Sequence, residues 1–386
     1  MLNIIPFNKP YITGKEFAYI GEAIANGHLS GDGIFTKKCQ EWLEKVTGCR
    51  KALLTNSCTG ALEMTAILSD IKPGDEVILP SYTFVSTANA FVLRGAVPVF
   101  IDIRSDTFNI DETKIETEIT DKTRAIIVVH YAGIACEMDT IMDIAGRYNL
   151  LVIEDAAHGL LCSYKGKSAG NFGHMATLSF HETKNIHSGE GGALLLNDES
   201  LIERAEIIRE KGTNRNKFFR GQVDKYSWVD IGSSYLPSEI SSAFLWGQIE
   251  YAEDITKKRL HIWNKYHLSL EDLEKSGKIR CPVVPSHCKH NGHMYSILLP
   301  DLQSRTFFLT RLNEKGINCV FHYIPLHISP GGLKYGRFSG QLDITQNISD
   351  RLVRLPLWID MGDKVDYVVE QVFLAMNEIF SKSLFC

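Results

Sequence analysis

One lysine of this chain stands where a folded protein can use it as a nucleophile. The apolar run at residues 176–180 is typical of a buried strand, and Lys184 follows it shortly before the glycine-rich turn at residues 189–192. Most lysines are solvated surface residues. At the end of a strand, however, partial burial can keep the amine of a lysine neutral and nucleophilic. The neighbouring motifs decide between these two interpretations.

Asp155 and His158 follow another apolar run, at residues 150–153, and could contact a planar ligand. Asp155 could simply cap the helix that follows it. In a dry site, a carboxylate could instead keep a ring nitrogen of a ligand protonated. His158 could stack on such a ring or hydrogen-bond to it, or be an ordinary structural histidine.

Small and hydroxyl-bearing residues at two strand ends could hold a phosphate. Ser57, Cys58 and Thr59 open a helix, where free backbone N–H groups and the helix dipole favour an anion. A helix with a Ser or Thr cap accounts for the same residues without any ligand. Ser179 lies just before Lys184 and could donate to the same phosphate.

An aromatic residue completes the set. Phe84 lies just past the apolar run at residues 76–79 and could lie flat on a heteroaromatic ring, or pack in the core. A phosphate cradle, a stacking ring, a carboxylate and a lysine are together what pyridoxal 5'-phosphate (PLP) requires. Lys184 would bind the aldehyde of PLP, and after its release by an amino donor it would move the proton of the donor's α-carbon. The residues therefore predict a PLP-dependent enzyme.

The elements that must position these residues alternate in type. Apolar runs at 52–54, 76–79, 97–101, 125–129 and 150–153 are separated by segments with helical spacing at 59–68, 84–93, 111–118 and 137–148. This alternation predicts an α/β fold with a mainly parallel sheet, covered by helices on both faces. Ligands of such sheets bind beyond the carboxyl ends of the strands. The runs at 176–180 and 193–196 are close together and should enter the sheet without a full helix between them.

The composition changes after about residue 245, which predicts a second domain. We expect an N-terminal arm at residues 1–15, a large PLP-binding domain at 16–245 and a smaller C-terminal α/β domain at 246–386. A long helical stretch at 238–273 should lead into the small domain, which should contain strands at 294–299 and 318–323 and helices at 305–315 and 364–380.

Composition and charge exclude several classes of protein. The net charge of -5 gives no basic footprint for nucleic acid. No apolar run approaches the ~18 residues of a membrane-spanning helix, and the first residues lack the pattern of a signal peptide. Nine cysteines without a CxxC pair indicate reduced thiols. We therefore expect a cytoplasmic protein that binds neither membranes nor nucleic acid.

Several motifs resemble those of the DegT/DnrJ/EryC1/StrS sugar aminotransferases, which are PLP enzymes of fold type I, the fold of aspartate aminotransferase. The resemblance is carried by Glu154-Asp-Ala-Ala-His158, by Ser179-Phe-His-Glu-Thr-Lys-Asn185, by Gly189-Glu-Gly-Gly192, and by longer stretches at 80–95, 130–139 and 218–226. It covers nearly the whole chain. The family is therefore expected to supply the fold, the cofactor and the reaction.

The resemblance implies roles for the residues already named. Lys184 would carry PLP, Asp155 would bind the pyridine nitrogen, and His158 and Phe84 would lie on opposite faces of the ring. Ser179 and the turn at residues 57–59 would hold the phosphate.

The resemblance also implies a homodimer with its active sites at the interface. Relatives usually carry Asn in a Gly-x-Asn motif that reaches the phosphate of the partner subunit. Ser234 stands in that place here, so this contact is either lost or shorter and bridged by water.

The resemblance implies substrates as well. L-Glutamate would be the amino donor, and carbon 4 of dTDP-4-keto-6-deoxy-D-glucose the acceptor, in surface polysaccharide biosynthesis; amination at carbon 3 of a related keto-sugar is the alternative. Gly31, Asp32, His322 and His327 lie in segments that resemble the family's substrate pocket, although both histidines could equally be structural. Relatives that dehydrate sugars carry His in place of the lysine, and Lys184 argues against that reaction.

Two other classes of protein compete with this interpretation. A metal-dependent hydrolase could use His287, His290 and His293, or His322 and His327, but the first cluster lacks a nearby acidic ligand and neither has the HExxH spacing. A non-catalytic regulator could be built on the same fold, and the presence of both Lys184 and Asp155 disfavours it.

Overall fold

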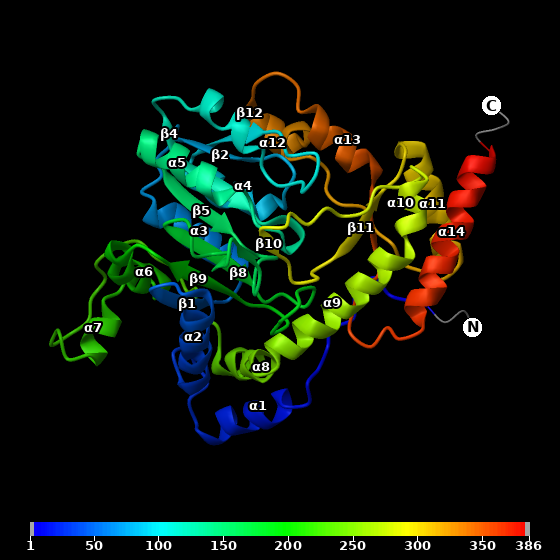
Figure 1. The fold of residues 1–386 in the computed structure, drawn as a ribbon. Coiled ribbons are helices and arrows are strands. Elements are labelled where there is room, and N and C mark those ends of the chain that lie inside the picture. Colours follow the sequence, from blue (N-terminus) through cyan, green and yellow to red (C-terminus); the bar gives the residue numbers. More distant parts are fainter. Residues whose placement is uncertain (1–3, 383–386) are drawn as a thin grey trace.

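A large sheet forms the centre of the protein in the computed structural model, which describes residues 4–382. Its eight strands follow the order β1-β9-β8-β5-β4-β2-β3-β12 (Figure 1). The strands are β1 (Lys51–Thr55), β2 (Glu76–Pro80), β3 (Val97–Ile101), β4 (Thr123–Val129), β5 (Leu151–Asp155), β8 (Met175–Ser179), β9 (Gly192–Leu196) and β12 (Arg337–Phe338). All neighbours are parallel except β9, which is antiparallel to both β1 and β8. The predicted mainly parallel sheet is confirmed.

Helices cover both faces of this sheet because its strands are apolar on both sides. One core contains Val77, Leu79 and Ile127 and packs against α3 (Cys58–Leu68), α4 (Val85–Val92) and α6 (Ile202–Arg209). Ile78, Val99, Ile126, Val128 and Val152 alternate with them along the strands and face α5 (Met138–Tyr148). The helices α2 (Ile34–Thr47) and α8 (Glu239–Ile249) cover β1, β8 and β9, and α1 (Glu16–Ala25) packs on α8.

Two predicted helical segments differ from the structure. Residues 111–118 form two 3₁₀ turns, η1 (Glu112–Lys114) and η2 (Glu116–Glu118), instead of one helix. Only Ile115 and Glu112 are buried there, and a segment this short with so little apolar surface gains little from a helix. The predicted stretch at 238–273 is broken into α8, α9 (Ala252–Ser269) and α10 (Glu271–Lys275). The first break falls at Tyr251, whose backbone leaves the helical region.

A second, smaller core lies beside the large sheet and is built by the C-terminal part of the chain. The strand β11 (Tyr295–Leu298) pairs with β13 (Leu352–Leu355), and α9, α11 (Leu302–Glu314) and α14 (Lys364–Lys382) pack around the pair. The predicted strand at 318–323 is wrong, since Val320 makes only an isolated bridge to Arg354. Apolar and aromatic residues of that segment line a cavity instead.

Other segments tie the two cores together. Beyond α11 the chain passes through η5 (Leu326–Ile328) and α12 (Pro330–Tyr335) to β12, which joins the large sheet at β3, and returns through α13 (Asp343–Arg351). The short strand β10 (Cys288–Lys289) pairs with β6 (Ser163–Tyr164), which pairs with β7 (Lys167–Ser168). A single cut at residue 245 therefore does not describe every contact between the two parts.

The N-terminal arm runs along the small core. Ile5 forms a parallel bridge with Ile317, and the carbonyl of Pro6 accepts a hydrogen bond from the Trp358 indole at 3.0 Å. Asn8 then reaches the large domain, donating to the carbonyl of Glu182 at 3.3 Å. The arm thus spans the boundary between the two cores.

Candidate active site

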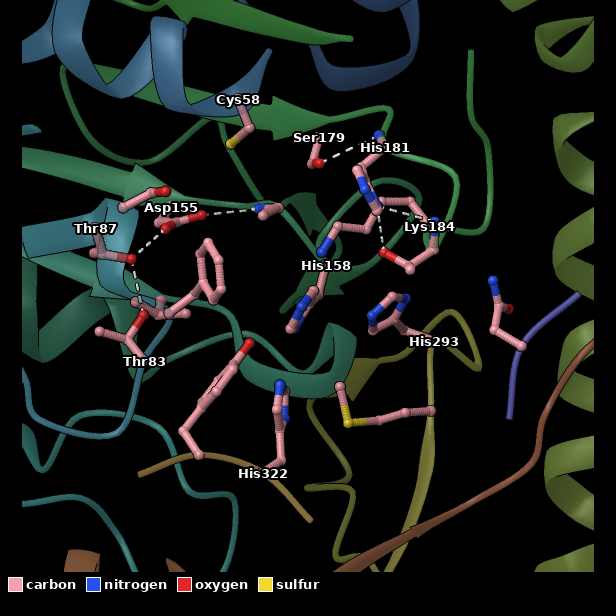
Figure 2. A pocket seen from close by; sticks show the side chains of 18 of the residues that line it. Cys58, Thr83, Thr87, Asp155, His158, Ser179, His181, Lys184, His293 and His322 are labelled. Carbon is pink, nitrogen blue, oxygen red and sulfur yellow. Dashed lines mark hydrogen bonds between the residues drawn. The ribbon is translucent and has the colours of Figure 1, made fainter. Parts of the chain in front are cut away.

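A cavity of about 590 Å³ lies where the carboxyl ends of the large-sheet strands face the small core. The large sheet contributes Asp155 and Ser179, both at strand ends, and Lys184 from the loop after β8 (Figure 2). The small core contributes the opposite wall: Arg259, His293, Met294, Val320, His322, Tyr323, Arg354, Leu355 and Leu357. The residues predicted from the strand ends therefore meet at one place.

Lys184 is held in a hairpin between two antiparallel strands. The ends of the hairpin are fixed because Ser179 pairs with Gly192, and the backbone N–H of Lys184 donates to His181 at 2.9 Å. Burial lowers the pKa of the Lys184 amine, and the nearby Arg354 cation lowers it further, although Asp155 acts in the opposite direction. At a given pH, a larger fraction of such a lysine is in the neutral amine form than of a surface lysine.

Asp155 occupies a dry position at the end of β5, with 5% of its surface exposed. Its Oδ2 accepts a hydrogen bond from the Thr87 hydroxyl at 2.7 Å, and its Oδ1 accepts one from the backbone N–H of Ala157 at 3.1 Å. Thr83 in turn hydrogen-bonds Thr87, at 2.8 Å. Burial raises the pKa of Asp155 above its usual range despite these donors, so the carboxylate is short of a cationic partner. A protonated ring nitrogen is a suitable partner.

The N-terminus of α3 provides the expected anion site on the same side of the cavity. Ser57 caps the helix by accepting the N–H of Gly60 at 3.0 Å, which leaves Cys58 and Thr59 at the first helical positions. Gly192 packs closely beneath this turn: a Cβ on Gly192 would lie 2.4 Å from the backbone N of Cys58. Burial raises the pKa of the Cys58 thiol to about 12, so it stays neutral. The turn fits a phosphate, with Ser179 also in the cavity wall.

Two histidines, one buried and one half-buried, stack beside Lys184. His158 and His293 have ring centroids 4.1 Å apart and nearly parallel planes (Figure 2). The Nδ1 atom of His158 accepts the N–H of Ala132 at 3.3 Å, and His293 Nδ1 lies 3.0 Å from Asn185 Oδ1. Burial lowers the pKa of both rings, and the charge of Lys184 adds to the effect, so both are neutral. The neutral His158 ring can contact a planar ligand without repelling a cation.

Phe84 stands at the entrance of the cavity, at the N-cap of α4, with 56% of its surface exposed. Its ring centroid lies 6.3 Å from that of Tyr323. An aromatic residue that is exposed in a cavity wall can stack on a ligand ring. Asp155, Lys184, the α3 turn, His158 and Phe84 together fit PLP.

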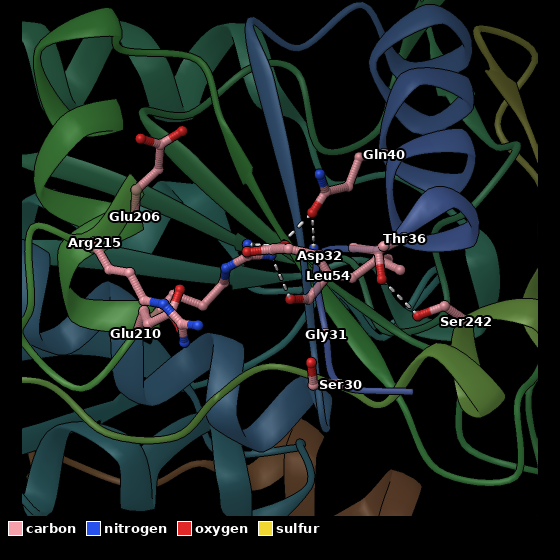
Figure 3. A network of polar contacts seen from close by, with 12 residues as sticks. Ser30, Gly31, Asp32, Thr36, Gln40, Leu54, Glu206, Glu210, Arg215 and Ser242 are labelled. Atoms are coloured by element: carbon pink, nitrogen blue, oxygen red, sulfur yellow. Dashed lines mark hydrogen bonds and ion pairs between the residues drawn. The ribbon is translucent and has the colours of Figure 1, made fainter. Parts of the chain in front are cut away.

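The remaining predicted residues do not line the cavity of this single chain. His327 is buried, its Nδ1 atom 2.6 Å from the Ser81 hydroxyl. Asp32 pairs with Arg209, which also donates to Gln40 at 2.9 Å and to the Leu54 carbonyl at 3.2 Å (Figure 3). Gly31 lies beside Asp32 in the same network (Figure 3). The carbonyl of Ser234 accepts from Asn56 at 3.3 Å, and its segment bridges to Glu210.

The histidines considered as metal ligands are dispersed. His287 pairs with Glu137 at 2.9 Å, His290 lies edge-on to Trp263, and His322 lies 2.9 Å from the Tyr131 hydroxyl. Across residues 4–382, no three His, Cys, Asp or Glu side chains gather as a metal site. No helix in that range is long and apolar enough to cross a membrane.

Sequence reasoning missed three residues that the geometry singles out. Thr87 lies one helical turn after Thr83, a spacing that could have suggested a hydroxyl pair facing the strand ends. Asn185 follows Lys184 directly and holds His293. Arg354 comes from the small core, and nothing in its local sequence indicates that it faces Lys184.

Comparisons with known proteins identify the family. A profile of the DegT/DnrJ/EryC1/StrS aminotransferase family matches residues 10–373. The chain belongs to this family. The aminotransferase is 37% identical to an uncharacterized protein of Methanocaldococcus jannaschii over 99% of both chains. It is 34% identical to GDP-perosamine synthase of Caulobacter vibrioides over 83% of this chain and 85% of that one.

Solved structures agree with the fold and the cofactor. Spr1654 of Streptococcus pneumoniae, determined in a pyridoxamine phosphate form, superposes with a TM-score of 0.90 at 25% identity, covering 97% of this aminotransferase and 100% of that chain. The same protein has been determined in a PLP form. The aminotransferase is thus a PLP-dependent enzyme of fold type I that acts on sugars, with an amino donor as its second substrate.

Proposed function

We propose that this enzyme transfers the amino group of L-glutamate to carbon 4 of dTDP-4-keto-6-deoxy-D-glucose, giving dTDP-4-amino-4,6-dideoxy-D-galactose. The observation that carries the transfer is the burial of Lys184 and Asp155 in one cavity beside the α3 turn. The sugar is supported by the stretches at 80–95, 130–139 and 218–226, which resemble the enterobacterial-type dTDP-4-amino-4,6-dideoxygalactose transaminase. The product would serve lipopolysaccharide or enterobacterial common antigen biosynthesis in the cytoplasm.

Lys184 and Asp155 would act directly in this reaction. Bound PLP supplies a ring that withdraws electrons from a substrate carbon as that carbon loses its proton. Lys184 attaches the cofactor through its neutral amine, and when an amino donor displaces it, the freed amine moves the proton at the substrate carbon. Asp155 would accept the N–H of the ring nitrogen, and Thr87 and Ala157 hold its carboxylate in place.

Other residues bind and orient the cofactor. The N–H groups at the start of α3, with Ser57, Thr59 and Ser179, bind the phosphate. His158 and Phe84 flank the ring. The apolar wall of the small core, including Val320 and Leu357, excludes water.

We also propose that the enzyme works as a homodimer with a second copy of this chain. Trp228, Phe17 and Phe219 expose 79%, 78% and 66% of their surfaces in the single chain, so a second copy could cover them. Phe219 belongs to α7 (Arg215–Phe219), which projects from the large domain (Figure 1). Ser234 follows this segment and would face the phosphate of the partner subunit. Light scattering on the purified protein should give twice the mass of one chain, and a monomer would exclude shared sites.

The visible spectrum tests the proposed reaction. The purified protein should be yellow, should bleach on addition of L-glutamate, and should recover its colour with dTDP-4-keto-6-deoxy-D-glucose. GDP-linked keto-sugars are a necessary comparison because one relative is named GDP-perosamine synthase. UDP-linked keto-sugars are a second comparison because another relative is named for a UDP-linked amino sugar. Nuclear magnetic resonance of the product distinguishes an amine at carbon 4 from the alternative at carbon 3 of a related keto-sugar. A protein that holds PLP but never bleaches with an amino acid would exclude transamination.

A further inference from the structure

One arginine in the cavity wall has no anionic partner among residues 4–382. Arg354, in β13, donates to the carbonyl of Phe321 at 3.3 Å, and its buried Nε has no acceptor in that range. Its guanidinium lies 4.7 Å over the ring of Phe7. Burial lowers the pKa of Arg354. A guanidinium in such surroundings is costly unless an anion neutralises it.

The second arginine of the cavity, Arg259, also has no anionic partner among residues 4–382, but its donors are already used. Arg259 donates to three backbone carbonyls, those of Gly292 at 3.2 Å, His293 at 2.7 Å and Leu357 at 3.3 Å. Its donors therefore hold the loop that carries His293 and the segment after β13. Arg259 has a structural task already, whereas Arg354 still has donors to offer.

The position of Arg354 indicates which anion it meets. Arg354 lines the same cavity as Lys184, His158 and His322, and its charge lowers the pKa values of all three. The phosphate of PLP is assigned to the α3 turn, which belongs to the large domain rather than to β13. A different anionic group must therefore approach Arg354.

Both substrates of the proposed reaction carry anionic oxygens, but at different distances from the reacting atoms. An amino-acid donor carries its carboxylate on the same carbon as the amino group that displaces Lys184. The diphosphate of a nucleotide sugar is separated from the keto carbon by the sugar ring. The aromatic and histidine neighbours of Arg354 are neutral, and Arg259 already donates to three backbone carbonyls. Arg354 is therefore the guanidinium of this wall that has donors left for a carboxylate.

We propose that Arg354 binds the α-carboxylate of the amino donor and so selects amino acids over simple amines. The inference rests on the proposed transamination. The carboxylate enters with the donor, neutralises the guanidinium and leaves with the 2-oxo acid product. The keto-sugar, which lacks a carboxylate, then occupies the cavity with its ring beside the neutral histidines.

The test separates the two half-reactions in the PLP-loaded enzyme. For Arg354→Gln, the L-glutamate concentration that gives half-maximal bleaching in single turnovers should rise by about 10- to 100-fold, the loss of one charge-assisted contact. Arg354→Lys should fall between this variant and the wild type. Reaction of the amino form with the keto-sugar should change far less in both. Bleaching by butylamine, which has no carboxylate, should be the same in wild type and variants.

Binding without reaction gives a second readout. Glutarate, a dicarboxylate without an amine, should raise the thermal midpoint of the wild-type holoenzyme and fail to raise that of Arg354→Gln. The matched control is Arg305→Gln: Arg305 also lies over a phenylalanine, Phe321, and has a buried Nε without a partner, but it does not line the cavity. This control should behave as the wild type does.

Three results would overturn the proposal. Unchanged glutamate dependence in both Arg354 variants would mean that the guanidinium does not meet the donor. A defect confined to the keto-sugar half-reaction would assign Arg354 to the diphosphate. If the wild type itself never bleaches with L-glutamate, the proposed function fails, and this proposal fails with it. If Arg354→Gln does not fold, Arg354→Lys and its glutarate response decide.

Discussion

The hydroxyl of Thr87 offers a sharp test of how Asp155 is held. Thr87→Val removes a donor 2.7 Å from Asp155 Oδ2 while keeping the volume of the side chain. A hydrogen bond to an ionised carboxylate contributes about 1.5–3 kcal/mol. The N–H of Ala157 still donates to the other oxygen, so we take the lower end. The rate of the glutamate half-reaction should fall by about tenfold.

The pH dependence of the glutamate half-reaction tests the same hydrogen bond, and the direction of its shift can be predicted. The bond from Thr87 favours the ionised form of Asp155, so losing it raises the pKa of Asp155 further. The acid limb of the rate profile should therefore move to higher pH in Thr87→Val. Stopped-flow absorbance at a series of pH values measures both effects. Thr87→Ser retains the hydroxyl and should restore the rate and the profile.

A matched control separates this effect from the general cost of losing a threonine hydroxyl. Thr47 is buried in α2, donates to the Leu43 carbonyl at 2.7 Å and does not line the cavity. Thr47→Val should lose some stability and keep the wild-type rate. If Thr87→Val shows the wild-type rate and an unmoved acid limb, Asp155 does not depend on this hydroxyl, and the reasoning is refuted.

Three further outcomes are expected. Lys184→Ala should abolish transamination and leave PLP bound only non-covalently, so that mass spectrometry after borohydride reduction finds no adduct; turnover by this variant would remove Lys184 from its role. Ser234→Ala should weaken PLP retention in equilibrium dialysis by about 1 kcal/mol, the contribution of one neutral hydrogen bond; identical retention would mean that the partner's phosphate is not contacted. Burial lowers the pKa values of His158, His293 and His322 in the folded state, so the unfolded chain takes up more protons below the ordinary histidine pKa near 6.5. The free energy of unfolding should therefore be unaffected by these histidines above that pH, and should fall as the pH is lowered through the range where the unfolded histidines titrate. If denaturant unfolding gives a free energy that does not change over this range, the three histidines are not kept neutral in the folded protein.

The parts of the fold that follow from local periodicity could be predicted. Strand and helix alternation gave the parallel sheet, and the short spacing between residues 176–180 and 193–196 gave two adjacent strands, which the structure pairs antiparallel. The prediction of a strand at 318–323 was wrong because it relied on β-branched and aromatic residues, which are typical of strands. In the structure, Val320, His322 and Tyr323 use their bulk to line a cavity.

The candidate site shows the same division. Lys184, Asp155 and the turn at 57–59 were predicted because they follow apolar strands, and chain order alone places strand ends at one edge of a parallel sheet. Arg354 could not be predicted, since it faces Lys184 only after the small core has docked beside the large one. Any role of Gly31, Asp32 and Ser234 in a site would depend on the proposed second chain, which the sequence implies only through family resemblance.

The contacts of the N-terminal arm affect the order in which the enzyme folds during its synthesis. Ile5 and Pro6 are synthesised long before their partners Ile317 and Trp358. Contacts so distant in sequence form late, because the intervening chain has to fold first. Phe7, which lies under Arg354, can therefore pack there only after β13 has been synthesised. The strands β1 to β9 of the large sheet can assemble on the growing chain, whereas the substrate cavity closes only after the small core has been made.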